Sequence, residues 1–350
     1  MAGLAGTTSA ILPGRFLLRR EPALALLLLL LLVVIGVRAP GYVTPGNLVT
    51  VLVDSSVLCI LVVGQLFALL IRGIDLSTAA NLAFVGMFLA LLSEADPGLP
   101  AIAYLLLAAL AGLLLGALNA VFIAVIGVPP IICTLGTMVI YRGMIFILSG
   151  GAWVSSHEMS QPFQTFPLET WIGLPNIVLV AIVVAASAWL FLRFSSTGRA
   201  FYAVGSSPLG ATFAGISIRR TTLLAFTLSG LCSGIAGYLW TARYAIAFTQ
   251  AGEGLEFAVI AACFIGGVSV AGGRGSVAGV LIGALFISVV QSALPFVRVS
   301  PFVQTAISGT IILIAVAVNS RAERPRGRQI LEAEDVQRNP GRGTLEEPSP

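Results

Sequence analysis

The chain has no lysine. All 19 of its basic residues are arginine, in a sequence of 350 residues. A phosphate-binding loop of the G-x-x-x-x-G-K-[ST] type needs its lysine to reach the nucleotide phosphates, so the chain cannot contain a standard loop of this type. Any step driven by ATP must therefore be powered by another polypeptide.

Charge is scarce as well. Only 10% of the residues are charged, 57% are hydrophobic and the mean hydropathy is +1.01, whereas soluble domains are roughly 25% charged and 45 to 50% apolar. A water-soluble fold is excluded. Five stretches hold no Asp, Glu, Lys or Arg, and each is long enough for one or two bilayer crossings at about 20 residues per helix. They are Pro97 to Tyr141, Thr170 to Leu192, Thr221 to Ala242, Gly275 to Val297 and Val299 to Ser320.

Motifs of catalysis and metal binding are missing. The four cysteines stand singly in apolar stretches, without C-x-x-C spacing, and we interpret them as packing residues. His157 is the only histidine, and one imidazole builds neither a metal site nor a catalytic triad. No G-x-S-x-G or H-E-x-x-H motif occurs. We expect no catalytic residue, no metal site and no nucleic-acid partner.

The hydrophobic runs predict an all-α polytopic membrane protein with about ten transmembrane helices. The first run follows Arg15, Arg19 and Arg20, as in a secretory signal peptide, but Arg38 and Pro40 follow it in place of an A-x-A cleavage site, which favours a retained helix. The predicted spans are residues 22–38, 50–71, 76–93, 99–126, 130–148, 173–193, 221–243, 255–271, 276–294 and 300–319.

The arginines predict the orientation. With an N-terminus in the cytoplasm, Arg72, Arg274 and the 194–220 loop fall inside, as the positive-inside rule requires, and the C-terminus is also cytoplasmic. The exceptions near the outer side or within a span are Arg38, Arg142, Arg243 and Arg298. We expect a cytoplasmic N-terminus at residues 1–21, a transmembrane domain at 22–320 that includes the 194–220 loop, and a disordered cytoplasmic tail at 321–350.

One internal similarity indicates a repeat. The pattern A-G-x-L-x-G-A-L occurs at residues 111–118 and again at 278–285, in the fourth and ninth predicted spans. Copies five crossings apart run in opposite directions, which predicts an inverted repeat of five plus five helices. The alternative is that Ala, Gly and Leu are simply common in membrane helices. Glycines spaced by four, as at Gly112 and Gly116, also permit close helix packing.

Polar groups within spans are candidate functional residues. Asp75 and Glu256 each begin a predicted span in a Gly-x-acid-apolar context; they could line a pathway or relay protons, or cap the helix and complement its dipole. Arg142 needs a carboxylate, a carbonyl or a water-filled cavity, and we expect a structural ion pair. Other polar side chains could bind substrate hydroxyls or hold helices together. They are Gln65, Asn81, Asn119, Thr134 and Thr137.

The 194–220 loop carries the most information. Its Ala, Phe and Tyr content predicts short helices that lie on another surface, either lipid headgroups or a groove of a partner protein. Composition alone leaves both open. Six residues are candidates for this contact and for the turns it needs: Gly198, Arg199, Gly205, Ala211, Gly215 and Ile216.

The same loop resembles the coupling region of ribose-type permeases of bacterial ATP-binding cassette (ABC) sugar importers, through its T-G-R, A-V-G and A-x-x-x-G-I elements. Further segments resemble that family in the same order along residues 45–319. They are Gly73 to Ser77, Val128 to Ile131, Thr134 to Thr137, Arg142-Gly143, Ser149 to Gly151, Leu255 to Ala262, Gly266-Gly267 and Gly272 to Gly275. Within the family, Asn81 and the Gly151 to Met159 loop look most like a rhamnose importer permease. Cys263 and the arginine-rich tail depart from the pattern.

The resemblance implies a second permease copy, a cytoplasmic ATP-binding subunit and a periplasmic binding protein that delivers a monosaccharide. No cofactor is expected on this chain, since ATP and Mg belong to the partner. In this hypothesis the coupling loop moves when the partner closes on ATP and rocks the helices, with Gly73, Gly272, Gly273 and Arg274 at helix breaks near the pathway. The rival hypotheses are an ion-coupled secondary transporter and a membrane scaffold or signalling protein that uses its tail.

The tail provides the first test. Deletion of Arg321 to Pro350 should leave transport nearly unchanged, because a disordered tail adds nothing to the helical body. Abolished function in an uptake assay of the truncated chain would favour the scaffold or signalling hypothesis.

Overall fold

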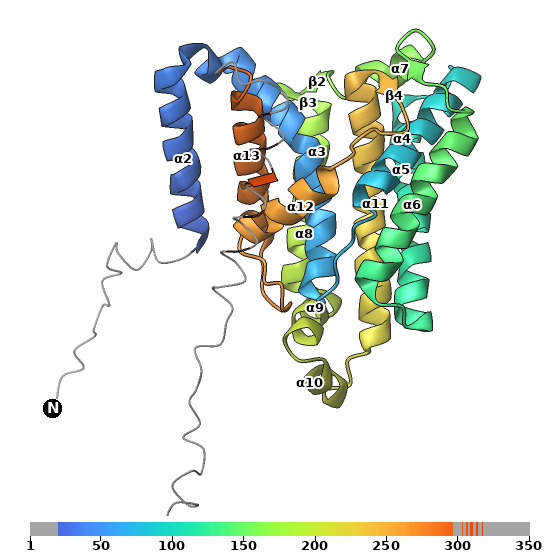
Figure 1. Cartoon of the computed structure of the whole chain (residues 1–350), viewed down its shortest axis with the longest axis vertical. Coiled ribbons are helices and arrows are strands. Elements are labelled where there is room, and N and C mark those ends of the chain that lie inside the picture. The colour runs from blue at the N-terminus through green and yellow to red at the C-terminus, as the bar shows by residue number, and fades with distance from the viewer. Residues whose placement is uncertain are drawn as a thin grey trace, which may run out of the picture.

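The protein is a helical bundle in a computed structural model, which describes residues 20–296 and positions 303, 306, 309, 310, 313 and 317 (Figure 1). In this part of the chain seven helices are long and apolar enough to cross a membrane. They are α2 (Arg20–Arg38), α3 (Pro45–Leu70), α4 (Thr78–Ala95), α5 (Ala101–Val121) with its extension η2 (Phe122–Ile126), α6 (Pro130–Ser149), α8 (Asn176–Phe194) and α11 (Ile218–Tyr244). Two shorter apolar helices follow, α12 (Leu255–Ile265) and α13 (Val277–Ala293).

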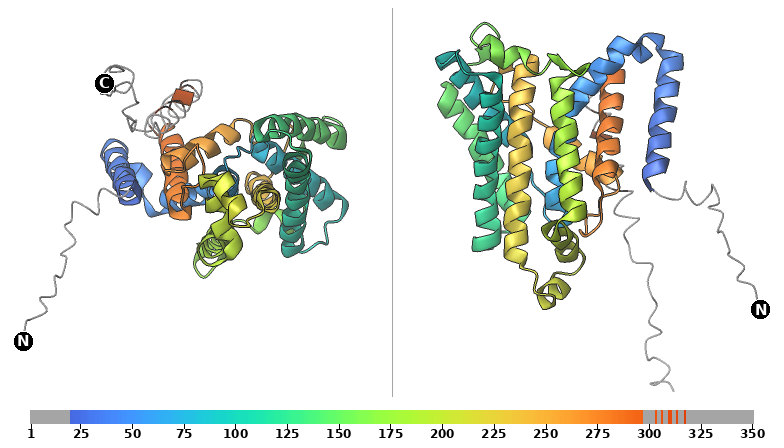
Figure 2. Two further views of the ribbon diagram at one scale, coloured as in Figure 1. Left: turned by 90° about the horizontal axis from the view of Figure 1, so that it is seen from below. Right: turned by 180° about the vertical axis from the view of Figure 1, so that it is seen from behind.

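The two ends of the bundle differ (Figure 2). The α7 face carries the short helix α7 (Gln161–Thr165) and two small antiparallel sheets. The α10 face carries α9 (Ser196–Ser206) and α10 (Pro208–Phe213). The sheets pair β1 (Val154–Ser155) with β4 (Ile246–Ala247) and β2 (Thr170–Trp171) with β3 (Leu174–Pro175). The short η1 (Pro40–Val43) joins α2 to α3.

Serine caps start the helices on the α10 face. The hydroxyl of Ser195 accepts from the Gly198 amide at 2.7 Å, and Ser207, Ser217 and Ser276 make the same bond at the starts of α10, α11 and α13. Such a bond satisfies one of the amides that a helix leaves free at its N-terminus. The predicted short helices of the 194–220 loop are therefore present, with sharp starts.

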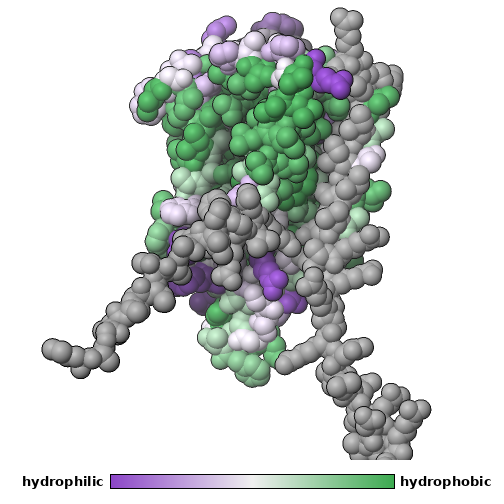
Figure 3. Space-filling view, turned by 90° about the vertical axis from the view of Figure 1, so that its left-hand side faces the viewer, coloured by the Kyte–Doolittle hydropathy of each residue, from purple (hydrophilic) through white to green (hydrophobic). Residues whose placement is uncertain are grey.

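Helix α3 lies at the centre of the core, with 89% of its most apolar window buried. Helices α8, α11, α12 and α13 contact it. The opposite holds at the periphery, where large side chains such as Leu106, Val139 and Ile147 are 64 to 80% exposed. Figure 3 shows hydrophobic residues gathered in a broad area below a rim of hydrophilic ones. This distribution suits a lipid-facing surface.

Helices α5 and α11 touch backbone to backbone along a glycine seam formed by Gly112, Gly116, Gly230 and Gly234. A Cβ on Gly112 would lie 2.3 Å from the Gly230 carbonyl oxygen, and one on Gly230 would lie 2.4 Å from the Gly116 Cα. Small residues at this spacing let two helices approach this closely. The predicted role of these glycines in helix packing is confirmed.

The second copy of the repeated pattern makes an equivalent seam. A Cβ on Gly283 of α13 would lie 2.1 Å from the Ala262 carbonyl oxygen of α12. Helix α5 starts near the α7 face, where the hydroxyl oxygens of Tyr104 and Ser160 lie 3.2 Å apart. Helix α13 instead starts near the α10 face (Figure 1). The two copies run in opposite directions, as predicted. Of the fifth pair of an inverted repeat, α6 is described in full and the predicted span 300–319 at six positions only.

The predicted span 255–271 is wrong as a continuous helix. Helix α12 ends at Ile265 after 11 residues, about 16 Å at 1.5 Å per residue, too short to cross a bilayer. Gly267 (φ 86°) and Gly272 (φ 79°) lie in the loop that follows, and this loop runs toward α9 (Figure 1). Hydropathy alone does not distinguish an apolar, glycine-rich loop from a helix, because it does not report the backbone conformation.

The remaining predictions about chain ends fall mostly outside the described residues. These are the cytoplasmic N-terminus at 1–21, the span at 300–319 and the tail at 321–350. Six positions of the predicted last span are described, and all six are helical. The four cysteines are buried and free, as expected of packing residues.

The glycine seam can be tested by one methyl group. Gly230→Ala forces a Cβ against the α5 backbone, so α5 and α11 must separate at a cost of about 1 to 3 kcal/mol in unfolding free energy. We expect a lower melting temperature of the purified protein in detergent. The matched control is Gly136→Ala on α6, where a Cβ meets nothing within 4 Å. If Gly230→Ala, Gly136→Ala and the parent protein had the same melting temperature, the close contact of α5 with α11 at the glycine seam would be contradicted.

Candidate functional site

A buried polar cluster surrounds the break between α3 and α4, at Ile71 to Ser77. Asp75 is 1% exposed. Its Oδ1 accepts from the Ser77 amide at 3.0 Å and the Ser77 hydroxyl at 2.6 Å, and its Oδ2 accepts from the Ser229 hydroxyl of α11 at 2.7 Å. Asp75 therefore joins the break to α11. At the start of α4 the bond to the Ser77 amide comes from Asp75, while the Ser77 side chain itself makes no cap bond.

Three other predicted residues meet at this break. The Gln65 amide donates to the Asp75 carbonyl at 3.0 Å and accepts from the Asp75 amide at 3.2 Å, in the orientation that satisfies both groups. Asn119 donates to the Ser77 hydroxyl at 2.8 Å, and the Thr134 hydroxyl lies 3.2 Å from the Ile74 carbonyl and 2.9 Å from the Pro130 carbonyl of its own helix, which share its one proton. Side chains from four helices, α3, α5, α6 and α11, thus converge on one irregular segment and bind several of its polar groups, as the interior of a membrane protein favours.

The other polar candidates lie apart from this cluster. Asn81 is 3.5 Å from the carbonyls of both Gly112 and Gly230, at the glycine seam. Thr137 donates to Thr134 of its own helix at 3.3 Å. Glu256 accepts from the Gly254 amide at 3.3 Å, in the first turn of α12, where a carboxylate complements the helix dipole.

Arg142 of α6 donates to two carbonyl oxygens, those of Thr249 and Ala251, each at 2.7 Å. Among the described residues its hydrogen bonds go to carbonyls, so the expected ion pair is replaced by carbonyl partners. The guanidinium thereby fixes the 248–254 segment, which leads from β4 into α12.

The α10 face brings together residues that the sequence separates widely. Arg72 at the end of α3 donates through Nε to the Gly205 carbonyl at 2.7 Å and through a terminal nitrogen to the Ser206 carbonyl at 3.0 Å. The Gly273 amide donates to the Leu70 carbonyl at 2.9 Å. A Cβ on Gly205 would lie 1.8 Å from that same carbonyl. The end of α3, the end of α9 and the glycine loop before α13 therefore form one packed unit.

The remaining coupling candidates shape α9 and α10. Gly198 packs against the Phe191 carbonyl of α8, and Arg199 donates to the Phe194 carbonyl at 3.3 Å from an exposed position.

The other candidates lie at the end of α10 and in the glycine loop. Ala211 is buried, and its carbonyl accepts from the Ile216 amide at 2.9 Å. Gly215 has a φ of 75° that turns the chain toward α11. Gly272 lies against Arg72, and the Arg274 carbonyl accepts from the Ser269 amide at 2.9 Å.

The tip of α10 is apolar and exposed. Leu209 is 68% exposed and Phe213 is 84% exposed. Both lie on the short helix α10, at the far end of the α10 face. We call Leu209 and Phe213 the α10 tip.

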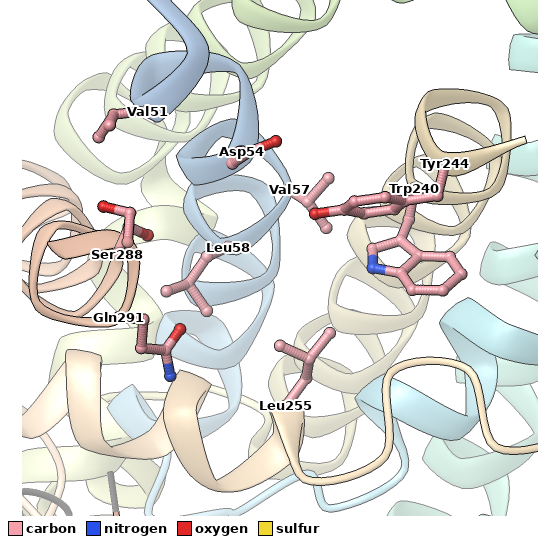
Figure 4. Close-up of a pocket in the computed structure, with 10 residues that line it drawn as sticks. Val51, Asp54, Val57, Leu58, Trp240, Tyr244, Leu255, Ser288 and Gln291 are labelled. Carbon is pink, nitrogen blue, oxygen red and sulfur yellow. The ribbon is translucent and has the colours of Figure 1, made fainter. Parts of the chain in front are cut away.

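A pocket of about 260 Å³ opens between α3, α11, α12 and α13 (Figure 4). Its α3 residues lie in the first half of that helix, which begins at the α7 face (Figure 1). The sequence analysis missed this pocket. Its lining residues are Val51, Asp54, Val57, Leu58, Trp240, Tyr244, Leu255, Ser288, Gln291 and Ser292. Asp54 also pairs with Arg243 at 3.3 Å. The sequence did contain a signal for this pair: Asp54 and Arg243 each place a charge inside an apolar span, and such charges usually pair with each other.

Residues 47–316 match the family described as branched-chain amino acid transport system / permease component. The chain belongs to this family. It is 36% identical over 289 residues to the D-allose transport system permease protein of Escherichia coli (strain K12), covering 82% of this chain and 87% of that protein. It is 32% identical over 312 residues to the ribose import permease protein of the same strain, covering 88% and 95%.

A third relative is the autoinducer 2 import system permease protein of Escherichia coli (strain K12 / DH10B), 32% identical over 285 residues, which are 80% of this chain and 81% of that protein. No solved structure matches the chain. The resemblance to ribose-type permeases is therefore confirmed, and the helices described above are those of a polytopic membrane permease.

Asp75→Ala tests the polar cluster. The substitution leaves the buried Ser77 and Ser229 hydroxyls without their acceptor, which costs about 1 to 3 kcal/mol for a buried unsatisfied group. A lower melting temperature in detergent is expected. Asp96→Ala is the control, since Asp96 lies in an exposed loop; an Asp75→Ala protein as stable as this control would show that the carboxylate does not hold the break.

Proposed function

We propose that this chain is the membrane-spanning permease subunit of an ATP-binding cassette importer, which passes a monosaccharide from a periplasmic binding protein to the cytoplasm. The observation that carries the proposal is the identity to D-allose and ribose permeases over more than four fifths of the chain. Rhamnose, another deoxyhexose or a pentose is the proposed substrate class, on the strength of the Asn81 and Gly151 to Met159 resemblance.

The motor is a separate ATP-binding subunit, which holds ATP and Mg. The absence of lysine from the sequence supports this, because a standard phosphate-binding loop needs one. A second permease copy completes the membrane body. The α10 face is cytoplasmic in this proposal, as the arginines of the 194–220 loop indicate, and the α10 tip docks on the ATP-binding subunit.

The coupling geometry supports a mechanical role. The α10 tip connects through α9 to the carbonyls of Gly205 and Ser206, and these bind Arg72 at the end of α3. A displacement of α10 would therefore act on the most buried helix of the bundle. No bond of the substrate changes in this mechanism, so the chain has a transport role and no catalytic one.

The alternative is an ion-coupled secondary transporter. Buried acids such as Asp75 are the observation that favours it, because intramembrane carboxylates often relay protons or bind ions. Both Asp75 oxygens, however, accept hydrogen bonds that hold the break between α3 and α4. This arrangement favours a structural carboxylate and hence the importer.

Uptake by liposomes separates the two functions. The purified chain alone should accumulate no labelled D-allose, D-ribose or L-rhamnose under a proton or sodium gradient. Addition of its ATP-binding subunit, its binding protein and ATP should start uptake of at least one sugar. Gradient-driven accumulation by the chain alone would sink the importer proposal.

The docking proposal predicts a separable defect. Leu209→Asp should abolish ATP-driven uptake and weaken copurification of the ATP-binding subunit, because a charge on the α10 tip would be buried unpaired at the interface. Leu168→Asp on the α7 face is the control, since Leu168 is also exposed, at 47%. Normal uptake by Leu209→Asp would place the docking surface elsewhere.

A further inference from the structure

Four aromatic rings lie in a row from the surface of the α7 face to the pocket. Trp153 is 61% exposed, and its ring centroid lies 5.5 Å from that of Phe248. Phe248 lies 6.1 Å from Trp240, and Trp240 lies 4.9 Å from Tyr244. We call Trp153, Phe248, Trp240 and Tyr244 the aromatic track.

The local structure explains how these rings come together. Strands β1 and β4 pair Val154 with Ala247, so the adjacent residues Trp153 and Phe248 lie opposite each other where the pairing ends. Trp240 and Tyr244 are four residues apart on α11 and share one face of the helix. Residues from three segments of the chain thus form one continuous row.

Polar groups face the inner end of the track. Figure 4 shows Asp54 of α3 and both Ser288 and Gln291 of α13 across the pocket from Trp240 and Tyr244, with Leu255 below them. The Asp54 side chain stays 36% exposed while its Oδ1 faces Arg243 at 3.3 Å. The pocket therefore combines aromatic faces with amide, hydroxyl and carboxylate groups, the usual pattern of a small-molecule site.

Size and charge select the ligand. The volume of about 260 Å³ is slightly below the roughly 300 Å³ at which pockets for drug-sized ligands begin, which suits one small molecule. The Asp54 carboxylate and the Arg243 guanidinium are paired with each other at 3.3 Å, so an amino acid would have to break this ion pair before its ammonium and carboxylate could bind there. A sugar ring instead offers an apolar C–H face to aromatic rings and hydroxyls to polar groups.

We propose that the aromatic track and the pocket form a monosaccharide-binding site on the outer part of the transport path, in which the track guides the sugar and Gln291, Ser288 and Asp54 bind its hydroxyls. This inference rests on the proposed function. It adds the residues that receive the sugar after release from the binding protein.

The test uses the complete importer in liposomes, with ATP-binding subunit and binding protein, and the sugar that the parent protein transports best. Trp240→Ala and Gln291→Ala should each lower uptake roughly tenfold at saturating binding protein, the loss expected when about 1.4 kcal/mol of stabilisation is removed. ATP hydrolysis should persist, so that fewer sugar molecules cross per ATP. Trp240→Phe, which keeps a ring, should retain most uptake.

Matched tryptophans control for general damage. Trp153→Ala should lower uptake, while Trp171→Ala should not, although Trp171 is also exposed on the α7 face, at 71%. Uptake within twofold of the parent in Trp240→Ala and Gln291→Ala would overturn the inference, and so would an equal loss in Trp171→Ala or a parallel loss of ATP hydrolysis. If Trp240→Ala does not fold, Gln291→Ala alone serves as the test, because Gln291 is exposed and its substitution should not disturb folding.

The two proposals fail in different ways. A parent protein that moves no sugar with its ATP-binding subunit and binding protein would refute the proposed function before any variant is compared. Preferential uptake of leucine over the sugars would refute the ligand class of the pocket. Sugar uptake that ignores Trp240 and Gln291 would refute the binding site alone.

Discussion

The backbone contact between α5 and α11 is the constraint on which the rest of the structure depends. No side chain separates the two helices at Gly112 and Gly230, so their backbones lie in direct contact and any larger residue there would push them apart. Ser229 directly precedes this contact and binds Asp75, and Asn81 reaches the carbonyls on both sides of it. The glycine seam therefore also positions the polar cluster and the start of α4.

Helix α3 links the two ends of the molecule. At the α10 face it ends beside Arg72, which binds the carbonyls of α9, and nearer the α7 face it carries Asp54 in the pocket. In the proposed mechanism ATP-driven movement of α10 is transmitted along α3. Movement of α3 would change the distance between Asp54 and Arg243 of α11, and hence the opening of the pocket. In this proposal the motor and the substrate act on opposite ends of one buried helix.

Sequence patterns predicted most helices, because each long span has enough apolar residues to be recognised by hydropathy alone. They placed the end of α12 too late: the break was predicted at Gly272, whereas the helix ends at Ile265 before Gly266, because the residues 267–271 are apolar enough to continue a helix by hydropathy. Gln65, Asp75, Asn119 and Thr134 were found as polar exceptions within spans, but their convergence depends on tertiary packing. The pocket was missed because Asp54 and Trp240 lie far apart in the sequence, and the importance of Trp240 depends on its neighbours.

Side-specific labelling tests most directly the claim that motor and substrate meet opposite faces. Single cysteines at Leu209 and Leu168 would be probed with a membrane-impermeant maleimide, the four native cysteines being buried. The account predicts labelling of the Leu168 position from outside intact cells, and of the Leu209 position only in inside-out vesicles, with protection by the ATP-binding subunit. Labelling of the Leu209 position from outside the cell would contradict it.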